Sequence, residues 1–157
     1  MNARPLVALI AVALGTTAVG LASAQPRPDA RLSAIAHRQG QMKRMREASK
    51  AISGFVQGAH NDPGQVRAAA ATLQDVGARM PRLWARGTAV GVGKSRAKPQ
   101  IWTEQAAFRR RIAGFRAASA AFARAAATGE KAQIGPAFRN VGASCKACHD
   151  FYQAPPL

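Results

Sequence analysis

The segment Ile134 to Tyr152, IGPAFRNVGASCKACHDFY, combines a helical apolar pattern with the motif C-x-x-C-H. Its apolar and cysteine positions recur every three or four residues: Ile134, Phe138, Val141, Cys145, Cys148 and Tyr152. This spacing is typical of one face of an amphipathic α-helix. Because both cysteines share the apolar face, they should point towards the element against which this helix packs. The segment therefore predicts an all-α fold with the motif facing the interior.

The motif CKACH, from Cys145 to His149, contains both cysteines of the chain. C-x-x-C-H is the attachment signature of c-type haem: the thiols form thioethers and the adjacent imidazole becomes an axial iron ligand. Two other interpretations compete. A thioredoxin-like redox pair would follow a strand, and no strand pattern precedes Cys145. A zinc site would need a fourth ligand, and His37 and His60 are not at zinc-finger spacing. The motif therefore favours one covalent haem c, bound through Cys145, Cys148 and His149.

Residues 1–24 have the pattern of a secretory signal peptide. Arg4 precedes an apolar run from Leu6 to Leu14, and ASA at 22–24 matches an A-x-A cleavage site. The apolar run is too short to favour an uncleaved membrane anchor. We expect residues 1–24 to be cleaved, leaving one soluble, periplasmic domain at 25–157 with no transmembrane segment. Since covalent haem attachment in bacteria follows export, the signal peptide and the motif support each other.

The chain is strongly basic, with 23 Lys and Arg against 7 Asp and Glu. Cleavage removes only Arg4 and leaves 22 basic against 7 acidic side chains, a net charge of +15. Such a field attracts anionic partners and speeds their encounter more than it sets affinity. We expect an acidic redox protein or an anionic membrane surface as partner. Nucleic acid is disfavoured by export and by the absence of a binding motif.

Helical periodicity extends over the rest of the mature chain. It predicts four amphipathic helices, at 29–58, 63–80, 99–128 and 131–153. Asp62-Pro63 is a helix start, Gly129 a helix stop, and Pro155 ends the last helix. The connection 81–98 is long and glycine-containing, whereas the others are short and make sequential helices antiparallel neighbours. The predicted fold is an antiparallel up-down-up-down four-helix bundle with haem in the bundle core and the first helix as the opposite wall.

From about residue 31 to residue 152 the chain resembles the class II cytochromes c, the cytochrome c′ family and its low-spin relatives. The stretches that carry the resemblance are Arg38-Gln39 with Met42, Met80-Pro81-Arg82-Leu83-Trp84, Pro99-Gln100-Ile101-Trp102, and Val141 to Asp150. The resemblance implies that Cys145 and Cys148 are the covalent haem cysteines and that His149 is the proximal ligand. Gln153 departs from the family pattern, because many gas-binding members carry an arginine there.

The resemblance also assigns roles on the first helix. Arg38 and Gln39 match a pair at the haem edge, where an arginine can neutralise a propionate. Met42 matches the position that faces the distal side of the iron. A thioether is a good sixth ligand, so a His149/Met42 pair would close both axial positions and favour electron transfer. Met45, one turn further on, is a competing ligand candidate.

If Met42 only packs in the core, the iron is five-coordinate with an apolar distal pocket. Such a pocket admits small uncharged gases such as NO or CO and excludes anions. The surroundings of Met42 and the segment 81–102 look more like the low-spin relatives. We therefore expect a one-electron carrier with His149 and Met42 as axial ligands, and we keep the five-coordinate gas-binding protein as the alternative.

Other functional classes find less support. No Ser-His-Asp set, paired carboxylates or phosphate loop is present, so we do not expect an enzyme. A haem-free exported thiol or metal-handling protein that uses Cys145, Cys148 and Met42 is a third hypothesis. The resemblance also allows a homodimer through the first two helices, which is common in the family.

Overall fold

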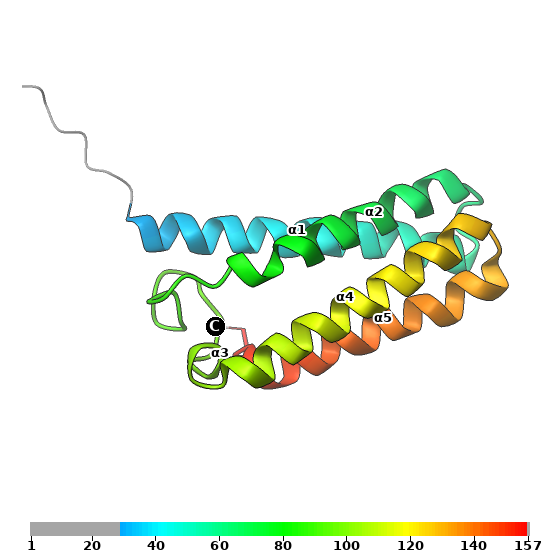
Figure 1. The fold of residues 1–157 in the computed structure, drawn as a ribbon. Coiled ribbons are helices and arrows are strands. Elements are labelled where there is room, and N and C mark those ends of the chain that lie inside the picture. The colour runs from blue at the N-terminus through cyan, green and yellow to red at the C-terminus, as the bar shows by residue number, and fades with distance from the viewer. Residues whose placement is uncertain (1–28, 157) are drawn as a thin grey trace, which may run out of the picture.

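The structure, a computed structural model, describes residues 29–156. The predicted signal peptide at 1–24 lies outside these described residues. The long helices are α1 (Ala30–Gln57), α2 (Pro63–Arg79), α4 (Gln105–Thr128) and α5 (Lys131–Tyr152). Two short helical turns, η1 (Met80–Arg82) and α3 (Gln100–Thr103), lie between α2 and α4. Sequential long helices run antiparallel (Figure 1), so the predicted up-down-up-down four-helix bundle is confirmed.

Capping residues, a carboxylate at the start of α2 and glycines after α1 and α4, determine where these helices begin and end. The Asp62 carboxylate accepts hydrogen bonds from the backbone N–H groups of Gly64, at 2.8 Å, and Gln65, at 3.2 Å, at the start of α2. The glycine that follows α1, Gly58, has a φ of 83°, and Gly129 after α4 has a φ of 76°. Both are left-handed conformations that glycine adopts without steric cost. The predicted ends of the first, second and last helices are therefore within a residue of the observed ones.

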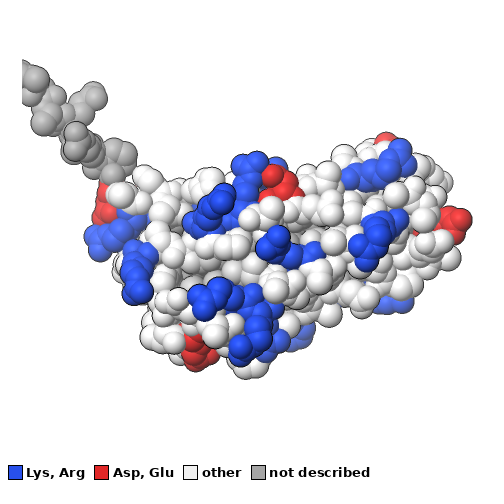
Figure 2. All heavy atoms as spheres, in the orientation of Figure 1, with Lys and Arg blue, Asp and Glu red and all other residues white. Residues whose placement is uncertain are grey.

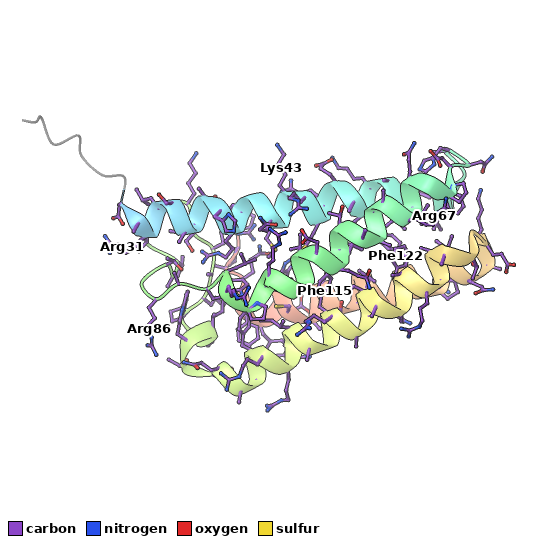
Figure 3. All side chains as sticks on the ribbon, turned by 45° about the horizontal axis from the view of Figure 1, so that its top comes forward. Arg31, Lys43, Arg67, Arg86, Phe115 and Phe122 are labelled. Atoms are coloured by element: carbon purple, nitrogen blue, oxygen red, sulfur yellow. The ribbon has the colours of Figure 1, made fainter. Side chains whose placement is uncertain are left out.

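The core is a continuous cluster of aliphatic and aromatic side chains from all four long helices. The most deeply buried apolar side chains are Ile52, Val66, Leu73, Val76, Phe122, Ile134 and Val141. Phe115 of α4 packs on α2 at Gly77, where a Cβ atom would lie only 3.0 Å from the ring. Phe122 of α4, which is labelled in Figure 3, meets Phe138 of α5 with ring centres 5.8 Å apart. Each fully buried side chain of this size contributes roughly 1.5–3 kcal/mol of transfer free energy.

The prediction of one continuous third helix at 99–128 is wrong. The chain bends at Glu104, which has φ −111° and ψ 42°, and this bend separates α3 from α4. The bend turns α3 towards the preceding loop, where the Trp102 indole Nε1 donates to the Trp84 carbonyl at 3.1 Å. Ile101 is buried in the same place. A tertiary contact thus outweighs helical periodicity over this one turn.

The predicted loop 81–98 begins with the turn η1 and is then fixed at several points. Arg38 of α1 donates from Nη1 to the Thr88 hydroxyl at 2.9 Å and from Nη2 to the Ser95 hydroxyl at 2.9 Å. All three side chains are buried. In Figure 1 the loop lies at the same end of the bundle as the end of α5. Within the described part of the chain, no helix has the length and apolarity needed to cross a membrane.

Candidate haem site

Two adjoining cavities, each of about 390 Å³, lie between α1 and α5 at the loop end of the bundle. The first is lined by Arg38 and Gln39 of α1, Arg96 of the loop, and Tyr152 of α5, among others. The second has a mainly apolar lining that includes Met45, Met80, Ile112, Phe115 and Cys145. Six residues line both cavities: Met42, Arg46, Trp84, Cys148, His149 and Gln153. The structure therefore brings the predicted residues of α1 and α5 to one place.

The two cysteines lie half-buried on the inner side of α5 and are not joined to each other by a disulfide. Burial raises the pKa of both thiols, and for Cys148 the pKa rises to about 11. Redox-active cysteine pairs have lowered thiol pKa values, so these surroundings argue against a thioredoxin-like pair. Among the described residues, no three His, Cys, Asp or Glu side chains come together as a metal cluster would require.

His149 lies one helical turn after Cys145, so its ring lies on the same side of α5. Desolvation by burial lowers the pKa of His149, and the positive charge of Arg96 lowers it further. Both effects favour the neutral imidazole, which is the form that ligates a metal. The wall provided by α1 carries Met42, which lines both cavities together with His149. A methionine and a histidine thus border the same space from two different helices.

The charge of the cavity lining suits an anionic cofactor. Arg38, Arg46 and Arg96 line the first cavity, and no Asp or Glu among the described residues lines either one. Haem carries two propionates that such arginines can bind. Trp84, which borders both cavities, has a buried Nε1–H without a hydrogen-bond partner in the described structure. The lining therefore fits a covalently attached haem. It offers two cysteine thiols, the imidazole of His149, several arginine cations and the indole N–H of Trp84 as a free donor.

Arg38 and Gln39 also hold the loop. Arg38 is only 5% exposed, and its guanidinium lies 5.1 Å from the centre of the Trp84 ring. Gln39 donates from Nε2 to the Lys94 carbonyl at 2.8 Å. Burial lowers the pKa of Arg38, which remains far above neutrality for a guanidinium. The predicted contact of Arg38 with a propionate stays a prediction, and the structure adds a role in fixing the loop against α1.

The lining also contains residues that were not predicted as site residues, among them Arg46, Arg96 and Trp84. Arg46 follows Met42 by one helical turn, so helical spacing could have placed it beside the cavity. Trp84 belongs to one of the stretches that carry the family resemblance, but the sequence assigned it no role at the site. Arg96 carries no sequence signal, because its position depends on how the loop folds back onto the end of α5.

A four-helix bundle with this motif and this cavity defines a c-type cytochrome. The sequence model of the family described as Cytochrome C' matches residues 33–153. The chain therefore belongs to the cytochrome c′ family. Its cofactor is the single covalent c-type haem of that family.

Individual relatives agree with this assignment. The cytochrome c′ of Alcaligenes xylosoxydans xylosoxydans is 31% identical over 121 residues, which cover 76% of this chain and 92% of the relative. A solved cytochrome c′ described as having an unusual ligand-controlled dimer dissociation aligns with a TM-score of 0.74 and 31% identity, over 80% of this chain and 97% of that one.

Two variants of the cytochrome c prime from Alcaligenes xylosoxidans are similar in fold, one solved as a nitric oxide complex and one with carbon monoxide bound. Their TM-scores are 0.71 and 0.72. Each is 29% identical and covers 80% of this chain and 97% of its own.

Proposed function

We propose that this protein is an exported haem protein that binds a small uncharged gas, NO or CO, at its iron. Cys145 and Cys148 hold the haem, and His149 is the proximal ligand. The observation that supports this proposal most strongly is the second cavity. Its lining is mainly apolar, with Met45, Met80 and Phe115 among its residues, and it also includes His149. Such a lining accepts a neutral diatomic molecule at little desolvation cost. The NO- and CO-bound relatives support the same conclusion.

The chain's own residues have distinct tasks in this proposal. The bound haem supplies an iron that can take a further ligand. His149 holds the iron from α5, and the thiols of Cys145 and Cys148 prevent release of the cofactor. The apolar side chains of α1, η1 and α4 that line the second cavity exclude water from it. Arg38 provides positive charge for a propionate. This assignment involves binding rather than catalysis, and no residue acts as a general acid or base.

The second candidate is a one-electron carrier with His149 and Met42 as axial ligands. One observation favours it: Met42 lines both cavities together with His149. A thioether bonded to the iron would close the distal side and favour the ferrous state. The two candidates therefore differ in one bond, between the iron and the Met42 sulfur.

Reduced protein titrated with CO, with visible spectra before and after, tests the choice. For the gas-binding protein we expect a high-spin spectrum, prompt CO binding, and a change of no more than about threefold in CO affinity for Met42→Leu, which conserves side-chain volume. Met45→Leu is the matched control, because Met45 is also a methionine of the second cavity. A low-spin wild type that binds CO slowly and becomes high-spin only in Met42→Leu would overturn the proposal in favour of the carrier.

The proposal extends to compartment and assembly. Export through residues 1–24 would deliver the chain to the periplasm, where mass spectrometry of the mature protein should find Gln25 at the N-terminus. The relative with ligand-controlled dimer dissociation supports a homodimer, and a groove between α1 and α2 with four alanines (Ala48, Ala51, Ala68 and Ala69) offers a face for it. Sedimentation velocity with and without CO tests the dimer. Reduction of the iron would involve an acidic redox partner.

A further inference from the structure

The loop segment 96–98 is strapped to the chain that follows α5. Ala154 N–H donates to the Arg96 carbonyl at 2.8 Å, and Lys98 N–H donates to the Tyr152 carbonyl at 3.0 Å. Between these two bonds lies an isolated antiparallel bridge. Tyr152 is the last residue of α5, less than one turn beyond the histidine of the motif. The strap therefore holds this part of the loop at a fixed distance from the proximal side of the site.

The strap also fixes the side chain of Arg96. Its Nε donates to the Ala154 carbonyl at 2.7 Å, and the residue lines the first cavity together with His149 and Gln153. Within residues 29–156 Arg96 forms no ion pair with a carboxylate. The Nε bond leaves the two terminal guanidinium nitrogens free of other partners in the described chain. A positive charge thus lies beside the cavity without a neutralising partner.

The other arginines of the first cavity are placed differently. Arg38 directs both terminal nitrogens to Thr88 and Ser95, and Arg46 lies on an exposed part of α1. Arg96 differs from both, because it lines the first cavity together with His149 while its Nε is held by the Ala154 carbonyl. Its neighbour Gln153 is neutral and does not offset this charge.

We propose that Arg96 is a positioning residue that raises the reduction potential of the iron through a fixed positive charge beside His149. Oxidation adds a positive charge to the iron, and a nearby cation disfavours that change more strongly where the surroundings are partly desolvated. Arg96 thereby favours the ferrous form, which is the form that binds CO. The inference rests on the proposed function in one respect, that His149 is the iron ligand.

The test is a spectroelectrochemical titration of the full haem-loaded protein. Arg96→Gln removes the charge and keeps hydrogen-bonding capacity, Arg96→Lys keeps the charge, and Arg124→Gln is the matched control because Arg124 is exposed and borders neither cavity. We expect a downward shift of the midpoint potential in Arg96→Gln that is larger than in Arg124→Gln. Arg96→Lys should lie closer to the wild type. Thermal unfolding of each variant shows whether the strap is intact.

Equal midpoint potentials in Arg96→Gln and Arg124→Gln would overturn the inference. So would equal shifts in the Gln and Lys variants, because the charge would then not be the cause. Wild-type protein without covalent haem would instead contradict the proposed function itself. The two failures are therefore distinguishable in the same set of samples.

Discussion

Cys145 and Cys148 differ in their neighbours although each is expected to form one thioether. Burial dominates the raised pKa of both thiols, and the Ser144 side chain moderates it only for Cys145. Covalent attachment at either position would remove a buried thiol and convert it to a thioether within the same apolar face. Each cysteine should therefore retain some haem on its own.

We predict that Cys145→Ala and Cys148→Ala each retain haem through one bond, at a level reduced several-fold. The double variant should lose all covalent haem, because no other thiol exists in the chain. Intact mass under denaturing conditions and a pyridine haemochrome assay measure this, after co-expression with haem-maturation machinery. Lys146→Ala is the control, since Lys146 lies between the cysteines and pairs only with Asp150 on the surface. Full haem incorporation in the double variant would contradict the assignment of the site.

The residues of the site differ in how far sequence could predict them. Cys145, Cys148 and His149 share one helix, so the spacing of the motif alone determines how they face one another. Met42 required the family resemblance, and the structure places it on the wall predicted for it. Arg96 and Trp84 could not be predicted, because the path of a long loop depends on buried contacts such as that between Arg38 and Ser95.

Helix ends can be tested with two glycines that have opposite requirements, one inside α4 and one directly after it. Gly129 follows the last residue of α4 and has a φ of 76°. A Cβ atom at this position would make only an ordinary contact with Pro63. The free-energy cost of a substitution there would therefore come from the backbone conformation. Gly114 lies inside the helix, with nothing within 4 Å of the place of a Cβ. The same substitution should therefore have opposite effects at the two positions.

We predict that Gly129→Ala lowers the free energy of unfolding by about 1 kcal/mol, because a Cβ disfavours the left-handed conformation. Gly114→Ala should raise it by roughly 0.5–1 kcal/mol, because alanine restricts the unfolded chain and favours the helix. Urea unfolding followed by circular dichroism gives both values. A stabilising effect of Gly129→Ala would show that α4 does not need its glycine cap.

At the scale of elements, periodicity predicts the helices well and their interruptions poorly. The four long helices were predicted because each of them buries one continuous stripe of its surface. The bend at Glu104 was not, since nothing local separates Pro99–Thr103 from the helix that follows. That bend arises from the burial of Ile101 and the bond of Trp102 to the loop, which only the folded molecule contains.

The positive charge of the molecule lies mostly on its surface, where few Lys and Arg side chains have an acidic side chain nearby. Figure 2 shows many Lys and Arg side chains and few Asp and Glu side chains over one face, and Figure 3 shows Lys43 extending away from α1. Within residues 29–156 there are five ion pairs, all of them at least partly exposed. Exposed pairs of this kind contribute little to stability. Repulsion among the remaining cations should therefore oppose folding.

We predict that sodium chloride stabilises the haem-loaded protein. Raising its concentration from about 10 mM to about 500 mM shortens the screening length from roughly 30 Å to a few ångströms. Repulsion between surface cations should fall, and the Tm measured by calorimetry should rise by a few degrees. Chloride is preferable to sulfate, which stabilises proteins by exclusion from their surface. A Tm that falls with added chloride would mean that the exposed ion pairs outweigh the repulsion.

The strap between residues 96–98 and 152–154 has a consequence for the order of folding. α1 and α2 can pair as soon as both have been synthesised, but the loop reaches its final position only after the residues beyond α5 have been made. Contacts this distant in sequence form late, because a long chain segment must be closed before they add any stability. We therefore expect the pocket to be still open when the cysteines of α5 are synthesised, and its closure by the strap to be one of the last steps of folding.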